Sequence, residues 1–193
     1  MPLLTDAAAA GRLIAERLRA ELPALRDQWQ RSQPVRHLVV DSLLPEDDVR
    51  QLAEVFPADD ALVRKATMRE KKSVGVDVRK YHPAIAAHLF AFQQPEVVDV
   101  VTQITGLAGS IPDPTLYASG ISVMQQADYL RPHLDNSHDG DQKLYRVANL
   151  LFYVTPGWQE ANGGNLELWD RRVREHVTLE SRFNRLVIME TNP

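Results

Sequence analysis

The chain has 193 residues, of which 44% are hydrophobic and 25% are charged, a composition typical of one globular domain and not of a disordered segment. Its 22 basic and 26 acidic residues give a net charge of -4, which argues against general nucleic-acid binding. The absence of cysteine excludes disulfides, thiolate metal sites and cysteine nucleophiles. Any metal ion must therefore be held by His, Asp, Glu or water.

No stretch approaches the roughly 18 uninterrupted apolar residues of a membrane span, so no membrane insertion is expected. The first residues also lack the basic segment and apolar core of a signal peptide. A cytoplasmic protein is therefore the default expectation.

The first 30 residues predict one helix with Thr5 as its N-cap, because apolar residues recur at three- and four-residue spacing from Ile14 to Trp29. This stripe is typical of core or dimer packing, so a homodimer is an open alternative. A strand at His37–Asp41 and a helix at 45–56 are expected next. The polar segment that follows, 58–82, predicts no definite element.

Two further helices are expected at 83–93 and 95–105, with Gly106 as the C-cap of the second. After Gly106, short runs rich in Val, Leu, Tyr and Phe predict five strands, at 116–124, 146–154, 165–169, 173–179 and 186–189. No long helix separates these strands, which argues against a parallel βαβ fold. The order predicts an α+β protein in which helices buttress a β-sandwich or barrel.

The residues most able to carry chemistry are His133 and Asp135. On a strand, residues two apart point to the same face, so an imidazole and a carboxylate could reach one ion. A third ligand from a facing strand would complete the two-His-one-carboxylate triad, which leaves open positions on iron(II). The pair alone is weak, since a polar turn whose side chains bond the backbone has the same composition.

Neighbouring strands support the metal-site interpretation. In the strand at 146–154, alternate residues share one face, which places Asn149 and Tyr153 together. The glycines at 163 and 164 permit a bulge or a close backbone approach before the next strand, where Leu166 faces the same side as Leu168.

Together these motifs resemble the 2-oxoglutarate- and iron(II)-dependent oxygenases of the prolyl-4-hydroxylase-like superfamily, over residues 113–193. The matching motifs, in chain order, are Asp128-Tyr129-Leu130, His133-x-Asp135, Arg146 with Leu150 and Tyr153, Trp158, Gly163-Gly164-x-Leu166-x-Leu168, and Phe183-x-Arg185-Leu186-Val187. Two positions depart from the family pattern. Ala127 replaces the usual glycine, and Met124 stands where many members have a tyrosine.

The resemblance implies a single oxygenase domain over 1–193. In it, 1–112 form a mainly helical buttress, and 113–193 form a double-stranded β-helix (distorted jelly roll) core that stops before its last strands. It implies that His133 and Asp135 are metal ligands and that Tyr153, Leu166 and Asn149 are cofactor-binding residues. The implied cofactors are Fe(II) and the co-substrate 2-oxoglutarate, with ascorbate as an optional reductant. No catalytic residue beyond the metal ligands is implied.

The family's third ligand, a histidine, lies a few residues beyond a strand like 185–189. The resemblance therefore implies that this ligand follows Pro193. Two histidines inside the chain are weaker candidates: His138 suits a hydrogen-bonded turn, and His176 suits a solvent-facing hairpin.

The predicted function is a dioxygenase that uses O2 to hydroxylate a C–H bond of a small molecule, an amino acid or a peptidyl side chain. The alternative is a non-catalytic jelly-roll binding module without a complete metal site, because two ligands do not make an oxygenase centre. The arginine-rich segment 171–174 predicts a solvated hairpin or, less simply, a contact with an anionic substrate.

Overall fold

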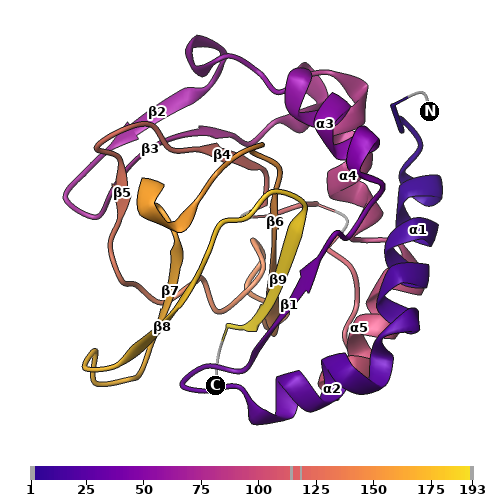
Figure 1. Ribbon diagram of the computed structural model, residues 1–193. Helices are drawn as coiled ribbons and strands as arrows, with labels where there is room; N and C mark the ends of the chain where they lie inside the picture. Colours follow the sequence, from indigo (N-terminus) through magenta and orange to yellow (C-terminus); the bar gives the residue numbers. More distant parts are fainter. Residues whose placement is uncertain (1–2, 114, 118, 192–193) are drawn as a thin grey trace.

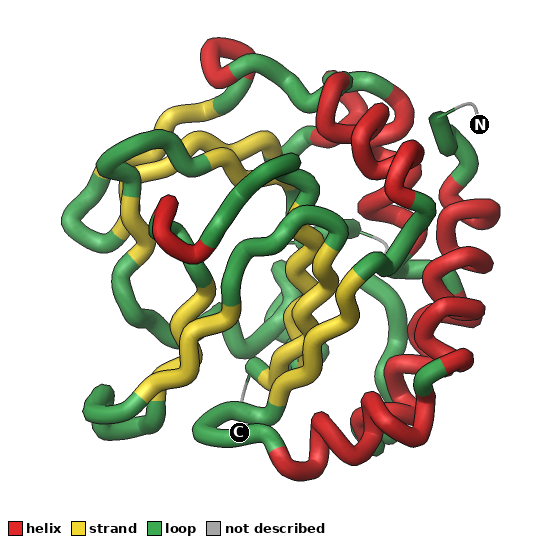
Figure 2. Tube along the Cα trace, in the orientation of Figure 1, coloured by secondary structure: helices red, strands yellow, loops and turns green. Residues whose placement is uncertain are grey.

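The computed structural model describes residues 3–113, 115–117 and 119–191 (Figure 1). Five α-helices in this part of the chain lie along one side, and the strands lie on the other (Figure 2). The helices are Ala7–Ala20 (α1), Leu22–Arg31 (α2), Glu46–Glu54 (α3), Pro83–Ala91 (α4) and Pro95–Thr105 (α5). Short 3₁₀ turns span Asp59–Ala61 (η1), Val78–Lys80 (η2) and Glu160–Asn162 (η3).

The strands form three sheets, in the orders β1-β9-β6, β2-β3-β4 with β5 also on β3, and β7-β8. They are His37–Asp41 (β1), Val63–Ala66 (β2), Glu70–Gly75 (β3), Ile121–Val123 (β4), Tyr129–Leu130 (β5), Ala148–Tyr153 (β6), Leu166–Trp169 (β7), His176–Leu179 (β8) and Arg185–Glu190 (β9). Every pairing among these strands is antiparallel. The predicted α+β class with antiparallel sheets is confirmed.

The single N-terminal helix predicted from the apolar stripe is wrong, because the chain bends at Glu21 between α1 and α2. Pro23, in the first turn of α2, has no N–H to continue the hydrogen bonds of α1. The N-cap is also one residue later than predicted: the Asp6 carboxylate, not Thr5, accepts a hydrogen bond from the Ala8 N–H at 2.9 Å.

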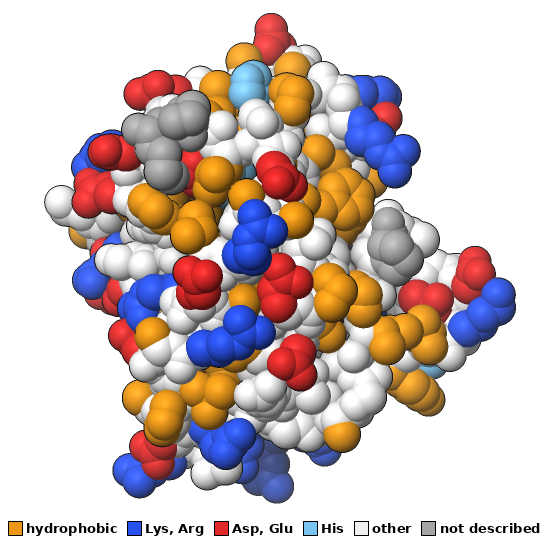
Figure 3. All heavy atoms as spheres, turned by 90° about the vertical axis from the view of Figure 1, so that its right-hand side faces the viewer, with side chains coloured by type: hydrophobic (Ala, Val, Ile, Leu, Met, Phe, Trp, Pro, Cys, Tyr) orange, Lys and Arg blue, Asp and Glu red, His pale blue; other side chains and the backbone are white. Residues whose placement is uncertain are grey.

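The apolar stripe of α1 and α2 is buried inside the chain's own core, including Ile14 and Trp29. On the outer face of the helices, charged and hydrophobic side chains are interspersed (Figure 3). The stripe therefore packs within the molecule, and the homodimer stays a prediction. None of the helices in the described residues is long and apolar enough to cross a membrane.

The sheet nearest the helices joins distant parts of the sequence. Leu38 of β1 pairs with Ile188 of β9, and both side chains are fully buried. Beyond the strands, the Asn184 side chain accepts from the Leu44 N–H at 3.1 Å and donates to the Leu44 carbonyl at 2.8 Å. These contacts fix the N-terminal part of the chain against β9.

The segment without predicted elements contains β2 and β3, which ion pairs hold in place. Arg64 donates two hydrogen bonds to Asp128, whose side chain has no exposed surface. Glu70 contacts Lys72 at 3.1 Å and Lys65 at 3.9 Å. All four residues of β2 are exposed, so these ion pairs, and not an apolar pattern, place that strand, whereas the second half of β3 is buried.

Candidate metal centre

His133 and Asp135 lie just after β5, which ends at Leu130. The expected strand geometry is therefore wrong for these two residues, since the chain leaves the sheet before reaching them. Pro132, which lacks an N–H for the ladder, lies at this departure. The side chains nevertheless converge, with 3.4 Å between His133 Nε2 and Asp135 Oδ1. The imidazole and the carboxylate meet as predicted, but outside regular strand structure.

The outer atoms of both side chains are held by hydrogen bonds. His133 Nδ1 lies 2.8 Å from the Arg131 carbonyl oxygen, which can only accept, so Nδ1 carries a proton. Asp135 Oδ2 accepts a hydrogen bond from the Asn149 side-chain amide at 3.0 Å. Such partners on the outer atoms are typical of metal ligands, because they fix the imidazole tautomer and the direction of the carboxylate.

The electrostatics of the pair favour an ionised carboxylate. The hydrogen bond with His133 is the main cause that lowers the pKa of Asp135, and the Asn149 amide and the charge of Arg146 also lower it. In turn, the hydrogen bond with Asp135 raises the pKa of His133, against opposing effects from burial and from the charge of Arg69. The result is an ionised carboxylate beside an imidazole that holds its proton more firmly, so a metal ion that binds here must displace that proton.

The spacing fits two ligands of one metal ion. Ligands that meet an ion at about 2.1 Å and at a right angle lie about 3.0 Å apart. The observed 3.4 Å between Nε2 and Oδ1 needs only a small side-chain adjustment. Within residues 3–113, 115–117 and 119–191, no group of three or more His, Asp or Glu side chains could hold a metal. The third ligand expected after Pro193 lies outside the described residues and stays a prediction.

The two other candidate histidines have different contacts. His138 bonds the Ser137 hydroxyl at 2.8 Å and stacks on Tyr145, with 4.3 Å between ring centroids. His176 stacks on Trp169 at 4.1 Å on an exposed strand position. Both observations agree with the predicted turn and hairpin roles.

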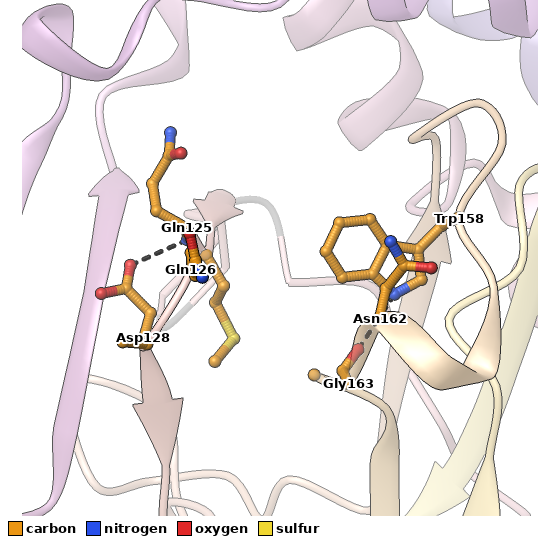
Figure 4. Close-up of a pocket in the computed structure, with 9 residues that line it drawn as sticks. Gln125, Gln126, Asp128, Trp158, Asn162 and Gly163 are labelled. Carbon is orange, nitrogen blue, oxygen red and sulfur yellow. Dashed lines mark hydrogen bonds between the residues drawn. The ribbon is translucent and has the colours of Figure 1, made fainter.

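A cleft of about 540 Å³ lies between the turn that precedes β5 and the loop that precedes β7 (Figure 4). Gln125 and Gln126 line one wall, and the Trp158 ring and Asn162 line the other. Trp158 Nε1 donates to the Gly163 carbonyl at 3.0 Å. The cleft thus separates two of the motifs on which the family resemblance depends.

The glycines of the second wall are needed for their backbone conformation and not for the close approach that the sequence suggested, since the nearest atom that a Cβ at Gly164 would meet lies 3.8 Å away. Gly163 and Gly164 have φ angles of 76° and 66°, in the left-handed region that favours glycine. Ala127 in the opposite wall has a φ of 63°, which explains why the family usually has glycine at that position.

Residues 119–193 match the family model of the 2OG-Fe(II) oxygenase superfamily. This match supports a 2OG-Fe(II) oxygenase of the prolyl-4-hydroxylase-like type. A solved structure of a Pseudomonas putida prolyl-4-hydroxylase is similar, with a TM-score of 0.62, 19% sequence identity, and coverage of 88% of this chain and 86% of that chain. At this identity the likeness shows the fold alone. No curated protein sequence matches.

The family match confirms the predicted enzyme class, a 2-oxoglutarate/Fe(II)-dependent dioxygenase, together with its cofactors Fe(II) and 2-oxoglutarate. In this oxygenase, the predicted cofactor-binding residues occupy two sheets. Asn149 and Tyr153 lie on β6, and Leu166 lies on β7 opposite Leu179. Burial raises the pKa of Tyr153, although a hydrogen bond with Ser181 opposes the rise, so its hydroxyl stays neutral at pH 7. The cofactor roles of these three residues stay predictions.

Sequence reasoning missed two features of this site. It assigned Asn149 to the co-substrate, and the structure shows that its amide holds Asp135. The inward face of the strand could have suggested this contact. It also missed Arg69, whose backbone carbonyl accepts from the Arg131 N–H at 3.0 Å, next to His133. No signal in the polar segment before residue 82 indicated that contact.

Proposed function

We propose that this oxygenase hydroxylates a C–H bond of a small molecule, an amino acid or a peptidyl side chain at a metal held by His133 and Asp135. The observation that carries the proposal is the convergence of His133 Nε2 and Asp135 Oδ1 at 3.4 Å. Their outer atoms are occupied by the Arg131 carbonyl and the Asn149 amide. Here the inner atoms contact each other while the outer atoms are held, an arrangement in which an ion would replace one contact, and this supports metal binding more directly than a polar turn does.

We further propose that the antiparallel sheets belong to a double-stranded β-helix and that 1–112 serve mainly as its buttress within one domain. The pairing of β6 with β9 supports the β-helix. Strands β2 and β3 are the exception within 1–112, because β3 pairs with β4 and β5 and so extends a sheet of the core. The pairing of β1 with β9 supports a close attachment of the buttress to the core.

When bound, iron and 2-oxoglutarate would supply the oxygen-dependent oxidation of the C–H bond. The protein's own residues hold and orient the metal ligands and the co-substrate. The Arg131 carbonyl keeps the proton of His133 on Nδ1, and Asn149 keeps Asp135 Oδ1 directed inward. The neutral Tyr153 hydroxyl is held by a hydrogen bond with Ser181, whose own proton is donated to the Gly164 carbonyl at 3.1 Å. Leu166, half-buried on β7, would contribute an apolar wall that excludes water.

The test is calorimetric titration of the full-length protein with Mn(II), which binds oxygen and nitrogen ligands without turnover. We expect His133→Ala to weaken Mn(II) binding by about a hundredfold or more, because a direct ligand contributes at least as much as its supporting partners do. His138→Ala is the matched control in the same segment and should leave the affinity unchanged.

Activity provides the second readout. The wild-type protein with Fe(II) should form succinate from 2-oxoglutarate, and His133→Ala should not. Unchanged Mn(II) affinity in His133→Ala, together with no succinate from the wild type across a broad substrate panel, would contradict the proposal and favour the non-catalytic binding module.

A further inference from the structure

Two exposed arginines, Arg69 and Arg131, lie beside the candidate metal centre on neighbouring strands. Arg69 immediately precedes β3 and Arg131 immediately follows β5, and these strands pair antiparallel. The Arg131 N–H donates to the Arg69 carbonyl at 3.0 Å, so the two residues are adjacent across the sheet. Arg131 is also bonded through its own carbonyl to His133 Nδ1. The sheet therefore places both arginines next to a proposed metal ligand.

The other cations of this sheet are neutralised by carboxylates. Asp128 accepts two hydrogen bonds from Arg64 and lies 3.8 Å from Lys71 Nζ. Glu70 contacts both Lys65 and Lys72.

Arg69 and Arg131 differ from these neighbours. Among the residues that the structure describes, neither guanidinium forms an ion pair with a carboxylate. Arg131 instead lies over the Tyr129 ring, 5.6 Å from its centroid. A protein with net charge -4 thus keeps two unneutralised guanidinium groups at the edge of its metal centre.

Guanidinium groups bind carboxylates and phosphates through paired, charge-assisted hydrogen bonds. We propose that Arg69 and Arg131 bind an anionic group, a carboxylate or a phosphate, on the substrate that is oxidised at the neighbouring metal. The proposal rests on the proposed function of His133 and Asp135. The co-substrate is a different anion, because its proposed partner, Tyr153, lies on β6 in the other sheet.

The test uses the full-length protein loaded with Mn(II) and 2-oxoglutarate, with inorganic phosphate as the probe. Mn(II) broadens the ³¹P signal of phosphate held nearby, so the titration reports binding beside the metal and not elsewhere. We expect Arg69→Gln/Arg131→Gln to weaken phosphate binding by about tenfold or more. A parallel titration with ¹³C-labelled acetate distinguishes carboxylate from phosphate recognition.

The matched control is Arg12→Gln/Arg31→Gln, which removes the same charge from α1 and α2. These helices lie on the opposite side of the molecule from β3 and β5 (Figure 1). Phosphate affinity should change by less than about twofold in this control, because exposed charges more than about 10 Å from a site are largely screened. Equal weakening in both double variants would overturn the proposal, since it would indicate a net-charge effect.

Three other results would also overturn it. One is unchanged phosphate binding in Arg69→Gln/Arg131→Gln. Another is loss of phosphate binding only in Arg172→Gln/Arg174→Gln, which would move the anion contact to the β7–β8 hairpin. The third concerns the 2-oxoglutarate concentration needed to saturate Arg69→Gln/Arg131→Gln. If it rises by the same factor as the phosphate affinity falls, the arginines belong to the co-substrate.

Failure of the proposed function gives a separate signature. If Mn(II) does not bind to the wild-type protein, the metal assignment fails. The arginine pair is then tested by calorimetric titration of the metal-free protein with phosphate, and a loss confined to Arg69→Gln/Arg131→Gln supports the anion site alone.

Discussion

The pairing of β1 with β9 and the pairing of β3 with β5 both join residues far apart in sequence, but different interactions hold them. Leu38 and Ile188 in the first pair are fully buried in the core. In the second pair, Leu130 and Tyr129 are partly exposed, and the nearby ion pairs of Asp128 fix the strands. The scaffold is therefore stabilised by apolar burial, whereas the sheet beside the metal centre is positioned by charge.

The two kinds of contact differ in strength. Burial of a leucine or isoleucine side chain contributes about 1.5–3 kcal/mol, whereas a partly exposed ion pair contributes about 0–1 kcal/mol. We infer that the sheet beside the metal centre opens at lower free energy than the β1–β9 pair, which is consistent with the weaker stability of ligand-binding segments in general.

The largest expected effect tests the buried side of this comparison. Leu38→Ala should lower the free energy of unfolding by about 3 kcal/mol, because it removes a fully buried side chain and leaves a cavity. Leu134→Ala is the matched control, since Leu134 is 87% exposed and should change stability by less than about 0.5 kcal/mol. Urea denaturation measures both. Similar losses in the two variants would contradict the division between scaffold and site.

A smaller effect, on binding, tests the site itself. Asn149→Ala removes the amide that orients Asp135 and should weaken Mn(II) binding by about 10–100-fold, with little change in the melting temperature. Gln126→Ala, an exposed amide in the neighbouring cleft, should leave the metal affinity unchanged. If Asn149→Ala binds Mn(II) like the wild type, Asp135 does not depend on this hydrogen bond.

The charged side of the comparison predicts a pH dependence. The hydrogen bonds from Arg64 are the main cause that lowers the pKa of Asp128 to about 2 from an ordinary value of 3.8. A lowered pKa in the folded state stabilises the protein above the ordinary value, and the contribution disappears as the pH falls through the lowered one. The stability difference between wild type and Asp128→Asn should thus be full at pH 6, smaller at pH 3 and close to zero only below pH 2.

Urea denaturation across that pH range measures this difference. Asp141→Asn, at an exposed carboxylate paired only with Lys143 among the ion pairs of the described residues, serves as the control and should show a much smaller difference at pH 6. A difference for Asp128→Asn that grows toward low pH has the wrong sign for a stabilising ion pair.

The smallest effect concerns Ala127, whose φ of 63° is unfavourable for any residue with a Cβ. The left-handed conformation costs a non-glycine residue about 1–2 kcal/mol, and glycine loses about 0.5–1 kcal/mol in backbone entropy, so Ala127→Gly should stabilise the protein by about 0.5 kcal/mol. Ala58→Gly, at an exposed position with a φ of -63°, should instead destabilise it. Chemical denaturation of both variants gives the comparison, and a loss of stability in Ala127→Gly would argue against strain in this turn.

The elements that could be predicted from sequence are those specified by local patterns. The helix at Pro95–Thr105 was predicted with its bounds, because Pro95 opens it and Gly106, with a φ of 75°, closes it. The convergence of His133 and Asp135 was also predicted, although the expected strand geometry around them was wrong.

What could not be predicted depends on partners distant in sequence. Strand β2 has four exposed residues and no alternating pattern, and Arg64 is held there by Asp128, 64 residues away. In the same way, nothing around Arg69 indicates that its backbone accepts a hydrogen bond from Arg131. Local propensity contains no information about such contacts, and they are the contacts that shape the surroundings of the metal centre.

The contacts that attach the N-terminal region to β9 also bear on how the protein folds. Asp41 and Arg185, joined by hydrogen bonds of 2.6 and 2.9 Å, are 144 residues apart. Contacts between residues so far apart in sequence form slowly, because the entropy of closing a long loop is lost before the contact stabilises the chain. During synthesis on the ribosome, β1 therefore remains unpaired until β9 has been made. The exposed edge of β1 in that interval is a place where a chaperone would act, or where aggregation would begin.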